Sequence, residues 1–289
     1  MLIIKTIIRL RSTLDKARAK GQTIGFVPTM GSFHEGHLSL MRQAKKDNDL
    51  CVVSIYVNPT QFGPKEDFKK YPRDLRRDSS MILKENIDIL FVPSDNEIYS
   101  DRYLTYIDVE KISQPLCGHF RPGHFRGVAT VVAKLLNIVQ PHVMYLGQKD
   151  AQQVAVLRTM IQDLNFPVKV EVVATSREQD GLAMSSRNKY LSPKDRQESV
   201  VLYKALSSAK AMVESGTSSP AKVKATIKSL IKKESSGKIQ YVECVNADTL
   251  ETLKRFEGRV LIALAVFFGK TRLIDNIVIP QHDSRKIKS

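Results

Sequence analysis

The sequence predicts an α/β protein with a Rossmann-like, doubly wound parallel sheet and a smaller C-terminal α+β domain. Short apolar runs alternate with helical patterns up to about residue 176, as in sheets of parallel strands. The run LCVVSIYVN is almost entirely apolar, which indicates a sheet covered on both faces. At 289 residues the chain exceeds the usual size of one domain. We therefore expect a larger domain over residues 1–176 and a smaller second domain over 177–289.

The first domain is predicted as a regular series of elements. Leu10, Leu14 and Ala17 recur at helical spacing before Gly21, which predicts a helix over 6–20. Further helices are predicted in HEGHLSLMRQAKKDN, over 74–85, in GVATVVAKLLNIVQ and over 152–163. The strands between them are TIGFVP, LCVVSIYVN, IDILFVP, HVMYLG and VKVEVVAT.

The pattern changes after residue 176. The polar loop SREQDGLAMSSRNKY leads into LSPKDRQE, where Ser192 can cap a helix that starts at Pro193. A second helix is predicted in PAKVKATIKSLIKKE. KIQYVECVN, RVLIALAVFF and RLIDNIVI have strand character without long helices between them, so this domain is predicted to be α+β.

Composition narrows the class of protein. The net charge of +15 attracts anions, and the basic end QHDSRKIKS is predicted to be solvated. Cys51, Cys117 and Cys244 are widely spaced and form no CxxC motif, so we expect neither a disulfide framework nor a thiolate metal site. The N-terminus has no continuous apolar region, so we expect a cytoplasmic protein that does not associate with membranes.

The segment PTMGSFHEGH, residues 28–37, places two histidines three positions apart after a predicted strand. Zinc proteases need a spacing of four, so the pattern disfavours zinc. Phosphate is an alternative ligand, because the N–H groups and dipole of a helix start attract anions. Ser32 and Glu35 match a capping box that would put His34 and His37 near the first turn. A merely structural role is the third interpretation, but ligands bind at such strand ends in open α/β sheets.

Two further segments have ambiguous roles when taken alone. VNPTQFGP ends a strand with Asn58 and Gln61, whose neutral amides could bind hydroxyl or carboxylate oxygens, although a plain turn is the better explanation of this segment alone. CGHFRPGHFRGV is a cationic loop predicted just before a helix. It either meets an anion or is a solvated turn.

Two other segments offer phosphate ligands. LGQKDAQQ follows a strand and carries Lys149, while Asp150 either caps the next helix or orients Lys149 or Mg²⁺ through water. GLAMSSRNKY places Ser185, Ser186 and Arg187 near the domain junction, where hydroxyls and a guanidinium suit phosphate oxygens.

Together these five segments resemble the pantothenate synthetase family, in the nucleotidyltransferase superfamily whose HxGH signature is related to that of class I aminoacyl-tRNA synthetases. They occur in the family's order and spacing over nearly the whole chain. The resemblance implies ATP-dependent condensation of pantoate with β-alanine through pantoyl adenylate, with AMP and pyrophosphate released. It also implies Mg²⁺ accompanying ATP and a homodimer. In this family resemblance, residues 1–176 are the nucleotide- and pantoate-binding domain, and residues 177–289 are the domain that closes over the site.

The resemblance assigns site residues position by position. The residues implied to bind ATP are Met30, Gly31, Ser32, Phe33, His34, Glu35, Gly36, His37, Gly147, Gln148, Lys149, Asp150, Ser176, Met184, Ser185, Ser186 and Arg187. Those implied to act in catalysis are His37 as proton donor, with His34, Lys149, Ser185, Ser186 and Arg187 at the phosphates. Gln61 is implied to bind pantoate and β-alanine, and Gln153 to bind pantoate. Ser176 departs from the family's usual apolar residue, commonly valine, which contacts adenine through its backbone.

Two rival functions remain open at this point. Spacing alone also fits another HxGH enzyme, such as a cytidylyltransferase that acts on a phosphorylated alcohol. The charge of +15 fits a nucleic-acid-binding module, but the chain has no recognised nucleic-acid motif, so we expect no nucleic-acid partner.

Overall fold

The computed structural model of the chain describes residues 1–64 and 66–282. The basic end predicted to be solvated lies, beyond residue 282, outside the described residues. The chain divides into two compact units. The first comprises Met1–Gln148 and Val156–Ala174, and the second comprises Lys149–Ala155 and the chain from Thr175 onward.

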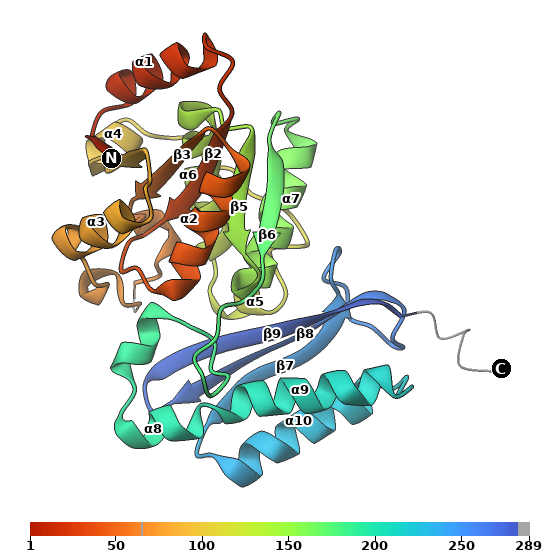
Figure 1. Cartoon of the computed structure of the whole chain (residues 1–289). Helices are drawn as coiled ribbons and strands as arrows, with labels where there is room; N and C mark the ends of the chain where they lie inside the picture. Colours follow the sequence, from red (N-terminus) through yellow and green to blue (C-terminus); the bar gives the residue numbers. More distant parts are fainter. Residues whose placement is uncertain (65, 283–289) are drawn as a thin grey trace. The chain divides into compact units, whose positions relative to one another are not determined.

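The first unit contains a six-stranded sheet in the order β1-β4-β3-β2-β5-β6, and every neighbouring pair is parallel (Figure 1). This confirms the predicted doubly wound parallel sheet. The strands are β1 (Leu2–Ile4), β2 (Ile24–Thr29), β3 (Leu50–Ile55), β4 (Ile89–Phe91), β5 (Val143–Gly147) and β6 (Lys169–Val173).

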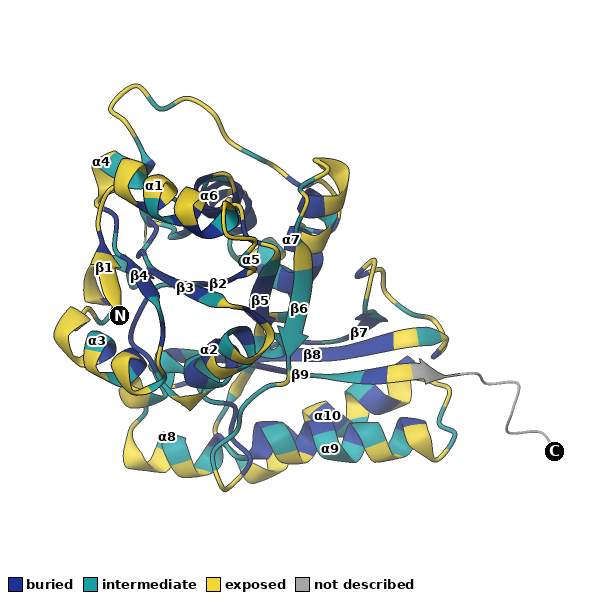
Figure 2. Ribbon diagram, turned by 45° about the horizontal axis from the view of Figure 1, so that its top comes forward, coloured by how far each residue is buried: buried dark blue, intermediate teal, exposed yellow. Residues whose placement is uncertain are grey.

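Helices cover both faces of this sheet, with α1 and α6 on one face and α2 and α3 on the other (Figure 2). The core under α2 and α3 is built from apolar residues such as Met41, Val53 and Ile82. The helices are α1 (Ile7–Arg18), α2 (Glu35–Asp47), α3 (Leu75–Lys84), α4 (Asp95–Ile98), α5 (Cys117–Phe120) and α6 (His124–Val139), with short 3₁₀ turns η1 (Pro59–Gln61) and η2 (Phe68–Lys70). The turn η3 (Gln148–Asp150) and helix α7 (Ala151–Asp163) contain residues of both units.

Two local features of this unit differ from the sequence prediction. Strand β1 was not predicted, because three residues next to a lysine have too short a pattern; its partner β4 makes it a strand. Helix α6 begins at His124, three residues earlier than the predicted segment, and α5 covers Cys117–Phe120. Most of CGHFRPGHFRGV, predicted as a loop, is therefore helical.

The second unit has an antiparallel sheet in the order β7-β8-β9, formed by β7 (Lys238–Asn246), β8 (Gly258–Phe268) and β9 (Thr271–His282). Its core joins this sheet to α9 (Val201–Glu214) and α10 (Pro220–Glu234). The predicted cap is confirmed, since Ser192 accepts a hydrogen bond from the Asp195 N–H at the start of α8 (Pro193–Glu198). Helix α9 was not predicted from the sequence. These elements confirm the predicted smaller α+β part.

Candidate active site

The predicted site residues of the first unit follow the carboxyl ends of neighbouring strands. Strand β2 ends at Thr29 and leads into the segment 30–37, while β3 ends at Ile55 shortly before Gln61. Strand β5 lies on the other side of β2 and ends at Gly147. Because β2 lies where the order of the strands reverses, these ends occupy the usual ligand position of an open α/β sheet.

The turn between β2 and α2 is held by a buried carboxylate from another helix. Gly31 and Ser32 have φ values of 78° and 54°, in the left-handed region. Asp78 of α3 accepts hydrogen bonds from the backbone N–H of Ser32 (2.7 Å) and of Phe33 (3.0 Å). Asp78 is only 1% exposed, and a Cβ at Gly31 would lie 2.8 Å from its Oδ2 atom. The turn therefore needs both the glycine and the acceptor.

The predicted capping box is wrong. Ser32 has a left-handed backbone and lies three residues before the first residue of α2, so it does not cap this helix. His34 is the N-cap of α2, and its Nδ1 atom accepts a hydrogen bond from the Gly36 N–H at 3.2 Å. The Glu35 carboxylate pairs with Arg42 of the same helix instead of reaching back to Ser32.

The two histidines of the HxGH segment lie together at the start of α2. Their ring centroids are 4.1 Å apart, and the His37 N–H donates to the His34 carbonyl at 2.8 Å. The ring of Phe33, which is fully buried, lies 5.5 Å from that of His37. The expectation that both histidines lie at or near the first helical turn is therefore confirmed.

Gln61 lies beside the same segment. Its Nε2–H group donates to the Met30 sulfur at 3.1 Å, while its Oε1 atom accepts from Asn58 Nδ2 at 3.2 Å. Asn58 is 1% exposed and is itself held by the Tyr99 hydroxyl, which donates to its Oδ1 atom at 2.9 Å. Burial raises the pKa of Tyr99 to about 12, so this phenol stays protonated. These bonds orient the Gln61 amide with its N–H side toward Met30.

The loop CGHFRPGHFRGV contacts the Gln61 backbone. His124 Nδ1 lies 2.8 Å from the Gln61 carbonyl oxygen, and Arg121 forms a two-pronged ion pair with Glu66 at 2.6 and 2.7 Å. Burial raises the pKa of Glu66, but the bonds and charge of Arg121 outweigh this and lower it overall. A Cβ at Gly127 would lie 2.4 Å from the Thr60 carbonyl, so α6 packs directly against η1. Most of this loop therefore supports the site.

Lys149 and Asp150 follow β5 and belong to the second unit. Lys149 Nζ lies 3.7 Å from the Asp150 carboxylate, whose side chain is 48% exposed. The carboxylate is thus within ion-pair distance of the lysine that it was suggested to orient. Gln152 is buried and Gln153 is partly exposed in the following turn of α7.

The segment from Ser176 to Arg187 doubles back on itself within the second unit. The Met184 N–H donates to the Ser176 carbonyl at 3.0 Å, and Arg177 and Ala183 form an antiparallel bridge. Ser185 caps the 3₁₀ turn η4 (Ser186–Tyr190) by accepting from the Arg187 N–H at 3.2 Å. The fold thus brings Ser185, Ser186 and Arg187 together on one short turn.

The buried cysteines Cys51 and Cys244 do not support thiolate chemistry. Burial raises the pKa of the Cys51 and Cys244 thiols to about 12, so neither is a thiolate at neutral pH. Over the residues that the structure describes, no cluster of three or more histidine, cysteine, aspartate or glutamate side chains could hold a metal ion. Within the same residues, no helix has the length and apolar character needed to cross a membrane.

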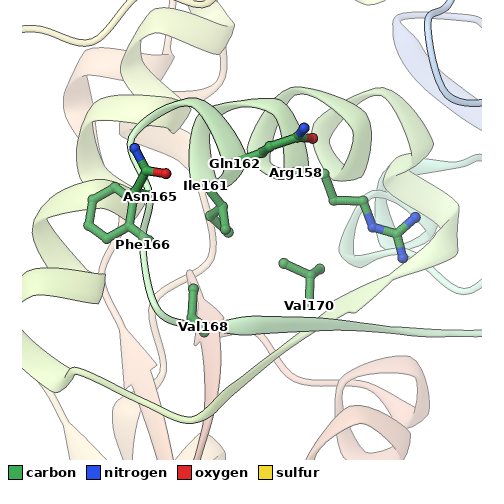
Figure 3. A pocket seen from close by; sticks show the side chains of 7 residues that line it. All are labelled: Arg158, Ile161, Gln162, Asn165, Phe166, Val168 and Val170. Atoms are coloured by element: carbon green, nitrogen blue, oxygen red, sulfur yellow. The ribbon is translucent and has the colours of Figure 1, made fainter.

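A separate hollow of about 550 Å³ lies between α7 and β6 (Figure 3). Arg158, Phe166 and Val170 are among its lining residues. It lies at the amino end of β6, whereas the predicted site residues follow the carboxyl ends of the strands. It contains none of the predicted site residues.

The residues that hold the turn 30–37, Gln61 and the loop 176–187 in place were not predicted from the sequence. Asp78, Tyr99 and Arg177 were not singled out, since each lies in an ordinary polar stretch. Their bonds to Ser32, Asn58 and Asp275 span 46, 41 and 98 positions in sequence. A sequence pattern could have pointed to Asp275 and Asn276 as buried polar residues. They are two adjacent polar residues inside the otherwise apolar strand pattern RLIDNIVI, and both are buried.

A parallel α/β sheet with an HxGH segment at the end of its central strand defines a nucleotide-binding type of α/β enzyme. Residues 2–278 match the model of the pantoate–beta-alanine ligase family, and the chain belongs to this family. It is therefore a ligase.

The relatives agree with this family over nearly their whole length. Pantothenate synthetase from Caldicellulosiruptor bescii is 52% identical over 279 residues, which is 96% of this chain and 99% of that protein. A crystal structure of pantothenate synthetase from Thermus thermophilus has a TM-score of 0.91 at 41% identity and covers 96% of this chain and 99% of its own. The pantoate–beta-alanine ligase from Francisella tularensis, solved with beta-gamma ATP and β-alanine, has a TM-score of 0.79 at 37% identity, with 96% and 97% covered.

Proposed function

We propose that this chain condenses pantoate with β-alanine to form pantothenate, with ATP cleaved to AMP and pyrophosphate. The observation that carries the proposal is the HxGH segment after β2 with the oriented Gln61 beside it, in a chain of the pantoate–beta-alanine ligase family. The ligands in the Francisella tularensis structure, beta-gamma ATP and β-alanine, support the same pair of substrates.

The proposed reaction has two steps. A pantoate carboxylate oxygen attacks the α-phosphorus of ATP, and the bond from that phosphorus to the pyrophosphate oxygen breaks. The β-alanine amine then attacks the carbonyl of pantoyl adenylate, the bond to AMP breaks, and the nitrogen loses a proton. Neither step needs a protein nucleophile, so binding, orientation and charge neutralisation supply the catalysis.

We assign the phosphates of ATP to the HxGH segment and to Lys149, Ser185, Ser186 and Arg187. In the first unit His34 and His37 would direct N–H groups at the phosphates, with His37 as proton donor, alongside the backbone of residues 30–37. Gly147 and Gln148 would contact the nucleotide. Lys149 and Arg187, with Ser185 and Ser186, would offset the negative charge that gathers at phosphorus. Ser176 would contact adenine through its backbone, and a serine serves as well as a valine in that contact.

Gln61 is proposed to bind pantoate and β-alanine, and Gln153 to bind pantoate. A thioether is a weak hydrogen-bond acceptor. The Gln61 N–H group that points to Met30 would therefore exchange readily to a substrate oxygen, while Asn58 keeps its orientation.

Magnesium is proposed to enter with ATP as part of the substrate. Mg²⁺ typically keeps several waters and uses one or two carboxylates together with substrate phosphates. The half-exposed Asp150 carboxylate fits such an outer role, through water.

We further propose a cytoplasmic homodimer and a functional boundary after Ser176, as the sequence analysis expects. Sedimentation equilibrium tests the assembly. A mass of about twice the chain's 32.6 kDa is the expected result, and a concentration-independent monomer would contradict it.

The direct test supplies ATP, Mg²⁺, pantoate and β-alanine and measures AMP. AMP release that depends on both pantoate and β-alanine is the expected result. Turnover of CTP with a phosphorylated alcohol, and no AMP from pantoate, would instead favour the rival cytidylyltransferase.

His37→Ala tests the HxGH segment within this reaction. Loss of one preorganised donor typically lowers a rate about 10²–10³-fold, so pantoate-dependent exchange of pyrophosphate into ATP should fall by this factor. His119→Ala is a matched control, because that histidine is exposed and outside the assigned site. Near-normal exchange in a folded His37→Ala protein would remove His37 from the mechanism.

A further inference from the structure

Two buried polar residues interrupt the apolar pattern of strand β9. Asp275 and Asn276 lie in the middle of RLIDNIVI and are 2% and 5% exposed. Burying a carboxylate is unfavourable unless it is paired and hydrogen-bonded. The hydrogen-bond partners of Asp275 and Asn276 therefore indicate their role.

Asp275 holds Arg177. The guanidinium donates to the two carboxylate oxygens at 2.6 and 3.0 Å, which is the two-pronged geometry typical of strong arginine–carboxylate pairs. Arg177 also lies over the ring of Tyr203, 4.2 Å from its centroid, so its orientation is restricted on a second side. Burial raises the pKa of Asp275, while Arg177 and Lys149 oppose this.

Arg177 in turn shapes the loop that carries Ser185, Ser186 and Arg187. Its Nη1 atom donates to the Gly181 carbonyl at 3.1 Å, and its backbone bridges to Ala183. Gly181 has a φ of 92°, and a Cβ there would meet the Tyr203 ring at 2.2 Å. The turn is thus closely packed around Arg177, immediately before the residues assigned to the phosphates.

Asn276 reaches the other proposed phosphate ligand of this unit. Its Nδ2 atom donates to the Lys149 carbonyl at 2.8 Å, and its backbone N–H donates to the Asp275 carboxylate at 2.8 Å. One pair of adjacent residues on β9 therefore restrains both the backbone of Lys149 and the Ser176–Arg187 loop, which are separate in sequence.

We propose that Asp275 is a positioning residue for adenylate formation, acting on the loop through Arg177 and on Lys149 through Asn276. This inference rests on the proposed function. A misplacement of about 1 Å can lower a rate roughly 10²-fold. The effect belongs to the first half-reaction, because Lys149 and the loop are assigned to the triphosphate, whose β- and γ-phosphates leave as pyrophosphate before the amine attacks.

The experiment measures the two half-reactions separately in Asp275→Asn. Pantoate-dependent pyrophosphate–ATP exchange reports the first, and pantothenate formation from synthetic pantoyl adenylate and β-alanine reports the second. The expected result is a roughly 10²-fold lower kcat for exchange, with the second half-reaction within about 3-fold of wild type. Equal losses in both half-reactions would mean a merely structural role and overturn the proposal.

Three further variants keep the test decisive. Arg177→Met combined with Asp275→Asn leaves no unpaired buried charge, so it should fold even if the single variant does not, yet exchange should stay low. Arg177→Lys keeps the charge but not the two-pronged geometry. Its kcat for exchange should lie between those of wild type and Asp275→Asn, roughly 10-fold below wild type. Asp248→Asn is the matched control, since it makes the same change in an exposed ion pair of the same unit.

The outcomes separate this inference from the proposed function. Near-wild-type exchange in the folded double variant would overturn the role of Asp275 and leave the proposed function intact. Absence of pantoate-dependent exchange in the wild-type protein would contradict the proposed function and this inference with it.

Discussion

The turn 30–37 and the loop 176–187 are assigned to the same substrate but are held in place by different chemistry. In the turn, the Asp78 carboxylate accepts two backbone N–H groups, so the backbone itself is fixed. In the loop, the Asp275 carboxylate binds the Arg177 side chain, which then binds the backbone at Gly181. The first arrangement restrains the turn directly, and the second restrains the loop through a long side chain.

The difference follows from the local backbone. Gly31 and Ser32 are both left-handed, so this turn cannot form regular backbone hydrogen bonds and needs an external acceptor. The loop at 177–183 forms its own antiparallel bridge and needs only an anchor at its base. We therefore expect loss of the Asp78 carboxylate to disturb the backbone of the turn directly, and loss of the Asp275 carboxylate to act on the loop only through Arg177.

Asp78→Asn should lower both the free energy of unfolding and the rate of exchange. An asparagine offers one acceptor oxygen and turns an NH₂ group toward one of the buried N–H groups, so the free energy of unfolding should fall by about 2–4 kcal/mol. Exchange of pyrophosphate into ATP should also fall roughly 10²-fold, because the histidines follow this turn. Urea unfolding and the exchange assay measure the two effects.

Asp74→Asn is the matched control for that change. Asp74 is the exposed N-cap of the same helix and accepts from the Arg77 N–H at 2.9 Å. Asparagine caps helices equally well, so the free energy of unfolding should change by less than about 0.5 kcal/mol. A comparable loss in both variants would mean that Asp78 acts only through helix α3 and not through the turn.

Glu66→Gln should have the smallest effect, since this residue supports Gln61 only through Arg121 and His124. The pKa of Glu66 is lowered in the folded protein. Its charge therefore stabilises the fold above its ordinary pKa of 4.5, and this stabilisation is lost as pH falls through the lowered folded value. At pH 7 the variant should be less stable by about 1 kcal/mol.

The pH dependence makes this prediction specific. The difference in urea midpoint between wild type and Glu66→Gln should be present at pH 7. It should shrink as pH falls below 4.5 and disappear below the lowered pKa of the folded protein, where the wild-type carboxyl is also neutral. A difference that stays constant with pH would show that the ion pair with Arg121 does not stabilise the fold.

The sequence by itself determined the alternation of strands and helices, the parallel sheet and the family. Apolar periodicity is local, and the motif PTMGSFHEGH and its four companion segments are contiguous, so both can be recognised without coordinates. For the same reason it missed β1, whose three residues become a strand only beside β4, and it misassigned Ser32 as a cap.

Only the tertiary structure decided what holds the motif residues in place. Asp78 lies 46 residues from Ser32, and Asp275 lies 98 residues from Arg177. No pattern along the chain reports such contacts, because a buried carboxylate is recognised by its partners and not by its neighbours in sequence. Local sequence thus predicts which groups face the substrate, whereas the folded chain determines which distant charges keep them there.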